Sequence, residues 1–470
     1  MIALTLAEIA RVTGGELRTA GEHTPDTVVD GTVDTDSRLI EPGGIFAAKP
    51  GAETDGHRFI GKAIERGAVL ALVERPTDDA VSQIVVPGVV SALADLARHV
   101  VARVRDGGAL TVVGITGSNG KTTTKNLIAR ILTDEGPTVY PHASFNNEVG
   151  APLTMLRVRH DTRYLVCEFG ASAPGEIARL AGLVTPDIGV VLMVGMAHAG
   201  GFGGIEATVK AKSELVGAIR PGGTAVLNAD DPRVAGMATL ARGRGVEVRW
   251  FGRGAAADVR ADEVVVDAAG TSCTVYADGT AASLRLRVLG EHHVMNALAA
   301  IAVATRIGVT LAECTSRLET VELAERWRMQ PLGTERIRII NDAYNASPDS
   351  MAAALRTLAQ IVGPGERTVA VLGAMSELGE YADDEHDRVG LLAVRLNIQR
   401  IVVVGQDARR MYLEAIAQGS WDGEAVFFPD ADAAFEYLVA ELREGDRVLV
   451  KSSNAAGLRH LGDRLGESVS

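Results

Sequence analysis

The chain has 470 residues, of which 47% are hydrophobic, and its formal net charge is −13. This length allows roughly two to four domains, and the apolar content is enough for several hydrophobic cores. An acidic balance without a clustered basic run argues against a nucleic-acid-binding surface. We therefore expect no nucleic-acid partner.

The cysteines and the apolar segments indicate the cellular compartment of the protein. Cys167, Cys273 and Cys314 are too widely spaced for a metal pattern or a disulfide framework, which favours a reducing compartment. The first residues, MIALTLAEIAR, include Glu8 and no basic start, so we expect no signal peptide. No apolar stretch approaches the roughly 20 residues of a membrane span. We expect a cytoplasmic monomer without membrane insertion.

The first predicted unit covers residues 1–84. A short helix stopped by Gly14-Gly15 precedes short β-type runs, a second helix and the strand VLALVER. Two polar stretches stand out, Asp36-Ser37-Arg38 and Thr54-Asp55-Gly56-His57. On local sequence alone turn and helix-capping chemistry explains both, and a binding role is the alternative.

The second predicted unit covers residues 85–320 and begins with an amphipathic connecting helix at 91–105. Predicted strands at 111–115, 163–169, 188–194 and 224–228 alternate with predicted helices at 121–135, 174–182, 206–219 and 292–307. This alternation predicts a doubly wound parallel sheet, whose ligands bind at the carboxyl ends of the strands. Short alternating runs with glycine turns between 259 and 289 predict an antiparallel β insert.

The third predicted unit covers residues 321–470. Predicted strands at 336–342, 368–375, 400–405 and 446–453 alternate with helices near 348–361, 385–397, 407–418 and 431–443. This pattern predicts a second, Rossmann-like sheet without a dinucleotide glycine fingerprint. The fold class is therefore α/β with three domains: a small α/β N-terminal domain, a central P-loop domain and a C-terminal Rossmann-like domain.

A phosphate-binding loop is predicted in TVVGITGSNGKTTTK, residues 111–125. A β-type run meets a glycine-containing loop that ends in a lysine and a Thr-rich helix start, so backbone N–H groups and the helix dipole can face phosphate oxygens. The strict pattern would have glycine at position 115, which is Ile115, so the loop is a variant; the alternative is a glycine-rich turn. The candidate contacts are Gly117, Ser118, Asn119, Gly120, Lys121, Thr122 and Thr123.

Polar residues near the ends of the neighbouring strands suggest a metal site. Glu168 ends one predicted strand and His198 follows another, and both belong to the edge where the phosphate loop lies. A carboxylate beside the Thr122 hydroxyl suits Mg²⁺, although histidine is an uncommon ligand for it. Taken singly, Glu168 could be an exposed strand-end charge and His198 an ordinary loop histidine. Asn146 and Asn147 could form a turn, bind substrate amides or order metal-bound water.

The third unit offers a polar loop from Asn341 to Asp349, which includes Asn345 and Ser347. Capping of the following helix explains part of this loop, but the loop is longer than capping needs. Arg328 could reach a phosphate across a domain cleft, although a surface charge is the simpler interpretation. A solvated helix face is the default for Lys210 and Lys212.

Taken together, these stretches resemble the Mur ligase family, from about residue 33 to 458. The matching motifs are GITGSNGKTTTK, SFNNEVGAPLTML, EFGASAPGEI, AHAGGFGG followed by KAKSEL, GEHHVMNALAA, NDAYNASPDSM, LGAMSELGE and LVKSS. Several of them resemble most closely the members that add D-alanyl-D-alanine. The chain departs from the family pattern at 193–196, His293, Asn341, Ala374 and Asn454.

The resemblance implies ATP and Mg²⁺ as cofactors and assigns roles to individual positions. Lys121 would hold the terminal phosphates, Thr122 and Glu168 would bind Mg²⁺, and His198 would serve a second Mg²⁺. Lys212 would become a metal ligand after carbamylation. The remaining implied contacts are Asn296, Arg328 and Asp342 for the nucleotide, Ser37, Arg38, Asp55 and His57 in the UDP-sugar-binding first domain, and Asn146, Asn147, Asn345 and Ser347 for substrate.

The implied reaction is ATP-dependent amide formation that adds D-alanyl-D-alanine to UDP-N-acetylmuramoyl-tripeptide through an acyl phosphate, in peptidoglycan precursor synthesis. The same chemistry on a neighbouring substrate is a rival interpretation, either that of a third-residue Mur ligase or that of a folylpoly-γ-glutamate synthetase. The loop around Asn345 argues against the former and Asp36-Ser37-Arg38 against the latter. A P-loop switch and a degenerate ligase acting as a binding module are two further rivals; the absence of an Asn-Lys-x-Asp stretch counts against the switch.

Overall fold

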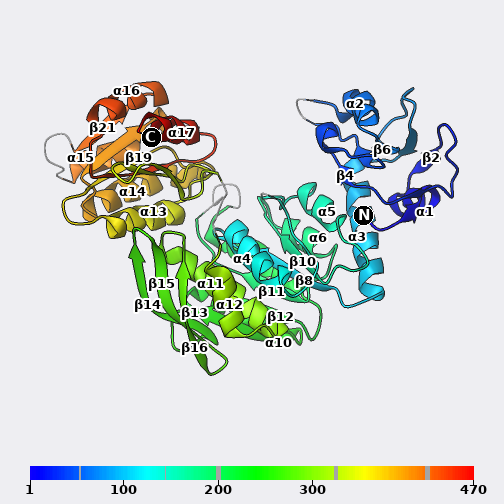
Figure 1. Ribbon diagram of the computed structural model, residues 1–470, viewed down its shortest axis with the longest axis horizontal. Helices are drawn as coiled ribbons and strands as arrows, with labels where there is room; N and C mark the ends of the chain where they lie inside the picture. The colour runs from blue at the N-terminus through cyan, green and yellow to red at the C-terminus, as the bar shows by residue number, and fades with distance from the viewer. Residues whose placement is uncertain (52–53, 143, 197–202, 322–325, 419–423, 470) are drawn as a thin grey trace.

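The computed structural model describes residues 1–51, 54–142, 144–196, 203–321, 326–418 and 424–469. It contains three helix-flanked sheets, and the ribbon separates into an N-terminal lobe, a central lobe and a C-terminal lobe (Figure 1). The prediction of a three-domain α/β protein is confirmed. Within the described residues, no helix is both long enough and apolar enough to cross a bilayer.

The N-terminal lobe is built on a five-stranded sheet of order β2-β7-β6-β5-β4, beside the two-stranded sheet β1-β3. Its first helix begins at an N-cap threonine, Thr5, and ends at Gly14, whose left-handed φ of 64° suits a residue without Cβ. The elements are β1 (Leu4–Thr5), α1 (Leu6–Thr13), β2 (Glu16–Arg18), β3 (Val28–Val29), β4 (Val33–Asp34), η1 (Ser37–Leu39), β5 (Ile45–Ala47), η2 (Gly56–Phe59), α2 (Ile60–Glu65), β6 (Leu70–Val73) and β7 (Ser82–Val85).

Helix α3 (Val89–Asp106) joins this lobe to the central one. Its buried residues recur with helical spacing, and they pack against α1 on one side and α5 (Gly150–Met155) on the other. One continuous apolar core therefore runs from the first lobe into the second.

The central lobe contains a nine-stranded sheet of order β16-β15-β14-β13-β12-β11-β8-β10-β9. The antiparallel insert is confirmed, and the structure adds that it continues the main sheet, because β14 pairs in parallel with β13. Its strands are β8 (Thr111–Thr116), β9 (Thr138–Val139), β10 (Tyr164–Glu168), β11 (Ile188–Val191), β12 (Thr224–Asn228), β13 (Glu247–Gly252), β14 (Val259–Asp267), β15 (Gly270–Ala277) and β16 (Thr280–Leu286). Its other helices are α4 (Lys121–Thr133), α6 (Glu176–Ala181), α8 (Ile205–Ala218), α9 (Pro232–Ala235), α10 (Ala238–Gly243), α11 (Glu291–Ile307) and α12 (Leu311–Leu318).

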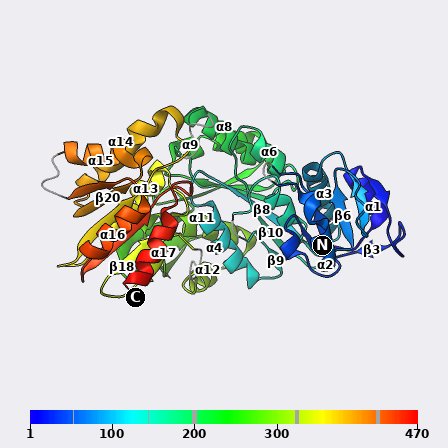
Figure 2. The same cartoon turned by 90° about the horizontal axis from the view of Figure 1, so that it is seen from above.

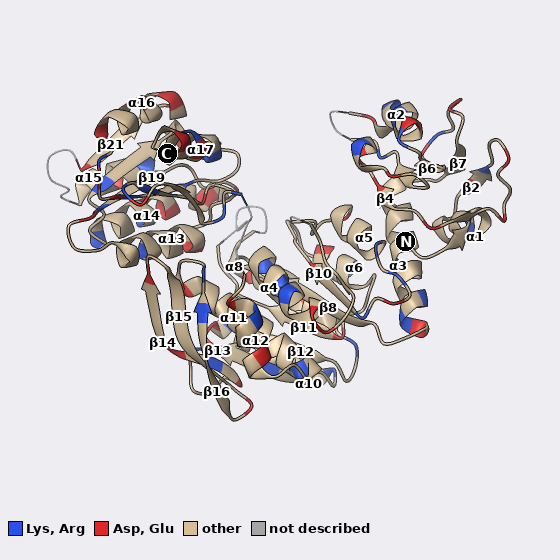
Figure 3. Ribbon diagram, viewed as in Figure 1, with Lys and Arg blue, Asp and Glu red and all other residues tan. Residues whose placement is uncertain are grey.

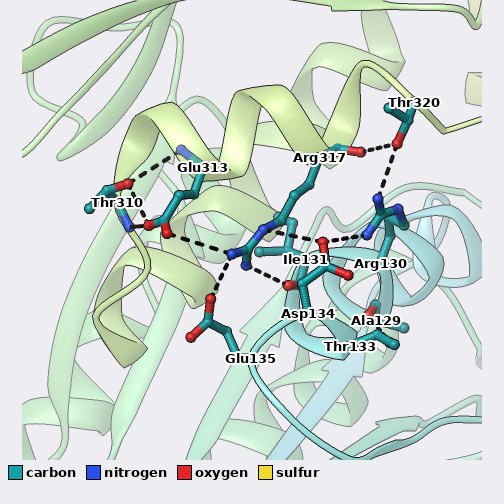
Figure 4. A network of polar contacts seen from close by, with 10 residues as sticks. All are labelled: Ala129, Arg130, Ile131, Thr133, Asp134, Glu135, Thr310, Glu313, Arg317 and Thr320. Carbon is teal, nitrogen blue, oxygen red and sulfur yellow. Dashed lines mark hydrogen bonds and ion pairs between the residues drawn. The ribbon is translucent and has the colours of Figure 1, made fainter.

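A polar network fixes the carboxyl end of α4, the helix that follows the predicted phosphate loop (Figure 4). Arg317 of α12 donates to the Ile131 carbonyl at 2.9 Å and pairs with Glu135 at 2.7 Å. Asp134 lies 3.4 Å from the same guanidinium. Since α4 is held at this end by a half-buried arginine, its opposite end is a stable support for the loop.

The C-terminal lobe contains a six-stranded sheet of order β17-β18-β22-β19-β20-β21, parallel except for β17. Its central strand β19 alternates between two cores, with Ala370 and Leu372 facing α13–α15 and Val369 and Val371 facing α16 and α17. Figure 2 shows the lobe from above, at the opposite end of the molecule from the N-terminal lobe. The elements are β17 (Gln330–Gly333), β18 (Arg338–Asn341), α13 (Pro348–Ile361), β19 (Arg367–Leu372), η3 (Gly379–Tyr381), α14 (Ala382–Arg395), β20 (Arg400–Val404), η4 (Gln406–Ala408), α15 (Arg409–Ala417), β21 (Ala425–Phe428), α16 (Ala431–Glu441), β22 (Asp446–Lys451) and α17 (Leu458–Ser468).

Charged side chains are spread over all three lobes, and neither sign gathers on one of them (Figure 3). This distribution agrees with the absence of a clustered basic run in the sequence.

Candidate active site

The predicted phosphate loop lies between the end of β8 and the start of α4. Gly120 has a left-handed φ of 83°, and a Cβ there would lie 2.3 Å from Asn296 Oδ1. Any other residue at this position would therefore meet both backbone strain and a collision. The loop is closed at its base by the backbone N–H of Ser118, which donates to the Met193 carbonyl at 2.9 Å.

Lys121 curls back over this loop. Its ammonium donates to the carbonyls of Gly117 at 2.7 Å and Ser118 at 3.3 Å. Burial lowers the pKa of Lys121, and the charge of Glu168 opposes that effect. The ammonium therefore lies in a sheltered position beside the loop, where it can neutralise a phosphate.

Glu168 ends β10, which pairs in parallel with β8, so its carboxylate lies beside the loop. Only 1% of Glu168 is exposed. Asn146 donates to its Oε1 at 2.7 Å, while its Oε2 is buried without a hydrogen-bond partner among the described residues. The buried Thr122 hydroxyl lies 3.1 Å from Ser144 Oγ. An unpaired carboxylate oxygen together with a hydroxyl is a donor set that fits a hard divalent cation.

The other predicted metal-site residues have different settings. Lys210 on α8 is exposed, as the predicted solvated helix face requires. Lys212 is only 2% exposed, so the prediction of a solvated face is wrong for this lysine. Burial, together with the charge of Lys121, lowers the pKa of Lys212 to about 7. His198 lies outside the described residues. In the parts of the chain that are described, no three His, Cys, Asp or Glu side chains converge as a metal cluster.

A cavity of about 780 Å³ opens beside the loop, between the central and C-terminal lobes. The central lobe contributes the loop, Glu168 and residues at the start of α11. The C-terminal lobe contributes side chains from the segment before β17, from the loop after β18 and from α13 and α14. The predicted site residues in its lining are Ser118, Asn119, Gly120, Lys121, Thr122, Thr123, Asn146, Glu168, Asn296, Arg328, Asp342 and Asn345.

The start of α11 forms the wall on the side of Asn296. The Asn296 Oδ1 accepts a hydrogen bond from Thr124 Oγ1 at 3.3 Å, which ties α11 to α4. The rings of His292 and His293 lie there with their centroids 4.1 Å apart and their planes tilted by 41°. Neither nitrogen of the buried His293 has a hydrogen-bond partner in the described part of the chain. Burial lowers the pKa of His292 to about 4 and holds that of His293 well below 6.5, so both rings are neutral.

The C-terminal lobe supplies the cations opposite the loop. Arg328 donates to Ser144 Oγ at 3.2 Å, and its guanidinium lies 4.0 Å from the centre of the Tyr344 ring. Asp342 accepts from Lys451 Nζ at 2.6 Å and from the Met329 N–H at 3.0 Å. Lys451 was not predicted as a site residue. Its position at the end of β22, next to the strand that carries the polar loop, was the signal available in the sequence.

A second cavity of about 300 Å³ lies where β18, β19 and β22 end in the C-terminal lobe. It is lined by Asn345, Ala346, Ser347, Ser376, Glu377, Ser453, Asn454 and Ala455. Ser347 and Asn345 belong to both the predicted polar loop and this lining. Ser347 caps α13 and also donates to Asn119 Oδ1 of the phosphate loop at 3.1 Å. Asn147, by contrast, accepts the N–H groups of Val149 and Gly150 in the turn that leads into α5.

The predicted residues of the N-terminal lobe do not line either cavity. Ser37 is buried in η1, and the exposed guanidinium of Arg38 pairs with Asp36. Asp55 Oδ1 lies 2.7 Å from His57 Nδ1, and the buried His57 Nε2 accepts the Glu74 N–H at 3.1 Å. His57 thus fixes the local chain, and a substrate role for these four residues stays a prediction.

Family models match all three lobes. The matches are to the Mur ligase family catalytic domain over residues 32–104, the Mur ligase middle domain over 115–304 and the Mur ligase glutamate ligase domain over 327–454.

Full-length relatives agree with these models. The UDP-N-acetylmuramoyl-tripeptide–D-alanyl-D-alanine ligase of Mycobacterium bovis is 44% identical, over 99% of this chain and 98% of its own. A crystal structure of MurF from Acinetobacter baumannii has a TM-score of 0.87 at 31% identity and covers 99% of both chains. MurF from Thermotoga maritima in complex with ADP has a TM-score of 0.80 at 26% identity, covering 94% of this chain and 98% of that one. With this identity over its full length, the chain belongs to the Mur ligase family.

Proposed function

We infer that the chain is an ATP-dependent ligase that adds D-alanyl-D-alanine to UDP-N-acetylmuramoyl-tripeptide in peptidoglycan precursor synthesis. The relatives that match over almost the full length carry this activity in their names. The observation that carries the inference in the structure is one cavity with the phosphate loop on one wall and Arg328, Asp342 and Lys451 on another. The chemistry thus takes place where two lobes meet.

ATP fits the larger cavity, with its phosphates over the loop and its base toward Asn296. Lys121, the N–H groups at the start of α4 and, from the opposite lobe, Arg328 would neutralise the phosphate charge. Thr122 and Glu168 would hold Mg²⁺, which supplies charge neutralisation at the phosphates when bound. The buried, unpaired Glu168 Oε2 supports this assignment.

Amide formation needs an activated carboxyl group, because oxide is a poor leaving group. The terminal carboxylate of the tripeptide would attack the γ-phosphorus of ATP, which forms a C–O–P bond and releases ADP. The amine of D-alanyl-D-alanine would then attack the acyl carbon, and phosphate would leave with the carboxylate oxygen. The protein contributes mainly alignment and charge neutralisation to these steps.

The amine substrate fits the smaller cavity. Asn345 lines both cavities, so an amine held in the smaller one lies next to the phosphates. The hydroxyls of Ser347, Ser376 and Ser453 and the backbone at the strand ends can hydrogen-bond a dipeptide carboxylate. The nucleotide sugar would bind to the N-terminal lobe, with contacts from Ser37, Arg38, Asp55 and His57.

Phosphate release from ATP tests this function. We expect release only when UDP-N-acetylmuramoyl-tripeptide and D-alanyl-D-alanine are both present. Lys121→Ala should abolish turnover without unfolding the protein, whereas the matched control Lys210→Ala, an exposed lysine of the same lobe, should retain it. Phosphate release that is indifferent to either substrate would refute the ligase function.

A further inference from the structure

Three consecutive backbone N–H groups after β11 bond to side chains from three separate parts of the fold. Val194 donates to Asp231, the N-cap residue of α9, at 2.8 Å. Gly195 donates to Ser118 Oγ of the phosphate loop at 2.9 Å. Met196 donates to Asp349 Oδ2 of α13, in the C-terminal lobe, at 3.2 Å. One short segment therefore connects the phosphate loop to the C-terminal lobe.

The contact between Gly195 and Asp349 is close. An ideal Cβ on Gly195 would lie 1.9 Å from Asp349 Oδ2, so glycine is the residue that lets the carboxylate reach the segment. The Ser118 hydroxyl also donates to the Gly195 carbonyl at 3.2 Å, which makes its contact with the segment reciprocal. A shift of the carboxylate would therefore reach Ser118 through two adjacent residues, Met196 and Gly195.

Helix capping does not account for the position of Asp349. The N-cap of α13 is Ser347, which makes a reciprocal capping box with Ser350. Asp349 instead points across the lobe boundary, where burial raises the pKa of its carboxyl group. Ser347 makes a second contact across the same boundary, to Asn119. The first turn of α13 thus reaches the phosphate loop by two routes.

We propose that Asp349 is a positioning residue that makes the geometry of the phosphate loop depend on docking of the C-terminal lobe. The proposal rests on the proposed function, since it concerns phosphoryl transfer at the same site. With α13 docked, the Asp349 carboxylate holds Met196, the segment holds Ser118, and the loop is aligned with Arg328 from the opposite lobe. Without the carboxylate the loop loses one of its supports, and small misplacements at a reacting centre cost large factors in rate.

Steady-state kinetics of two substitutions test this role. Asp349→Ala should lower kcat roughly 10- to 100-fold while the KM for UDP-N-acetylmuramoyl-tripeptide changes less than about twofold. Asp349→Asn should restore kcat to within about threefold of the wild type, because the amide oxygen can still accept the Met196 N–H. The matched control is Asp432→Ala: Asp432 occupies the same turn of α16, is exposed and pairs with Arg464, and its loss should leave kcat unchanged.

A double-mutant cycle separates positioning from general destabilisation. If Asp349 acts through Ser118, the variant carrying both Ser118→Ala and Asp349→Ala should be no more than about twofold slower than the worse single variant. Gly195→Ala places a Cβ where the Asp349 carboxylate lies, so it should lower kcat as Asp349→Ala does. Combined with Asp349→Ala, it should cause little further loss of kcat.

Three results would overturn the proposal. Asp349→Ala could have the same kcat as the control Asp432→Ala, or Asp349→Asn could have a kcat as low as that of Asp349→Ala. The third is a double variant whose loss in kcat equals the product of the two single losses. Wild-type turnover in the same assay tests the proposed function separately. A wild type that forms no amide refutes that function, whereas an active wild type matched by Asp349→Ala refutes only the role of Asp349.

Discussion

Replacing Glu168 by Gln should raise the stability of the ligand-free protein and at the same time weaken its binding of Mg-ATP. Oε1 accepts from Asn146, and Gln keeps that acceptor, while the buried Oε2 has no partner among the described residues. Leaving a buried polar group unpaired costs about 1–3 kcal/mol, and more when the group is charged. The Gln Nε2 that replaces Oε2 is also unpaired but neutral, so its cost is smaller than that of the carboxylate oxygen. The lost attraction to Lys121 offsets part of this gain, but the Lys121 ammonium bonds to the Gly117 and Ser118 carbonyls. We expect a net gain of about 1–2 kcal/mol in the free energy of unfolding, or a rise of roughly 2–4 °C in the Tm of the central lobe.

Differential scanning calorimetry with and without Mg-ATP measures both halves of this prediction. Mg-ATP at about 100 times its Kd should raise the free energy of unfolding of the wild type by about 2.7 kcal/mol. The increase should be clearly smaller for Glu168→Gln, because this variant lacks one of the proposed metal ligands. The control Glu247→Gln, an exposed glutamate on β13, should change neither quantity. A ligand-free Glu168→Gln protein that melts below the wild type would contradict the predicted gain in stability, and one that keeps the full Mg-ATP shift would contradict the metal-binding role of Glu168.

Three further perturbations concern buried or half-buried ionisable groups. Because burial lowers the pKa of His292 to about 4 from 6.5, the unfolded chain binds more protons below pH 6.5, and the unfolding free energy should fall between about pH 6.5 and pH 4. The variant carrying both His292→Gln and His293→Asn should show a flatter Tm–pH curve in that window, and parallel curves would contradict this. Burial lowers the pKa of Lys212 to about 7, so much of its amine is neutral at pH 8 and can react with CO₂. Removing CO₂ from the buffer should therefore lower kcat, and adding bicarbonate should restore it. Equal kcat values in the CO₂-free and bicarbonate buffers would exclude carbamylation. Arg317→Ala should lower the unfolding free energy by about 1–2 kcal/mol through the lost Glu135 and Ile131 contacts, with the KM for ATP unchanged because Arg317 does not line the cavity; an unaltered Tm would contradict this.

The strand–helix alternation and the phosphate loop were predictable because they rest on local patterns. The predicted helix 348–361 coincides with α13, whose proline and capping serine are adjacent in sequence. Elements with weaker patterns were not predicted, among them β13, β17, α12 and α17. The continuation of the insert into the main sheet depends on the pairing of β14 with β13, which local sequence does not encode.

The cross-lobe contacts of the site could not be predicted from local sequence. Ser347 meets Asn119, and Arg328 meets Ser144, across separations of 228 and 184 residues. Asn341, one of the departures from the family pattern, is buried and donates to the Arg459 carbonyl and to Asp463 of α17. Its side chain therefore holds α17 against the end of β18, a packing role that its place in a polar loop did not indicate.

In the proposed reaction, ATP activates a carboxylate of UDP-N-acetylmuramoyl-tripeptide for attack by D-alanyl-D-alanine. Mass spectrometry of a reaction with the terminal carboxylate of the tripeptide labelled with ¹⁸O on both oxygens tests it most directly. We expect an amide product that keeps one labelled oxygen and a released phosphate that carries the other. Unlabelled phosphate, or phosphate formed without an amide product, would contradict it.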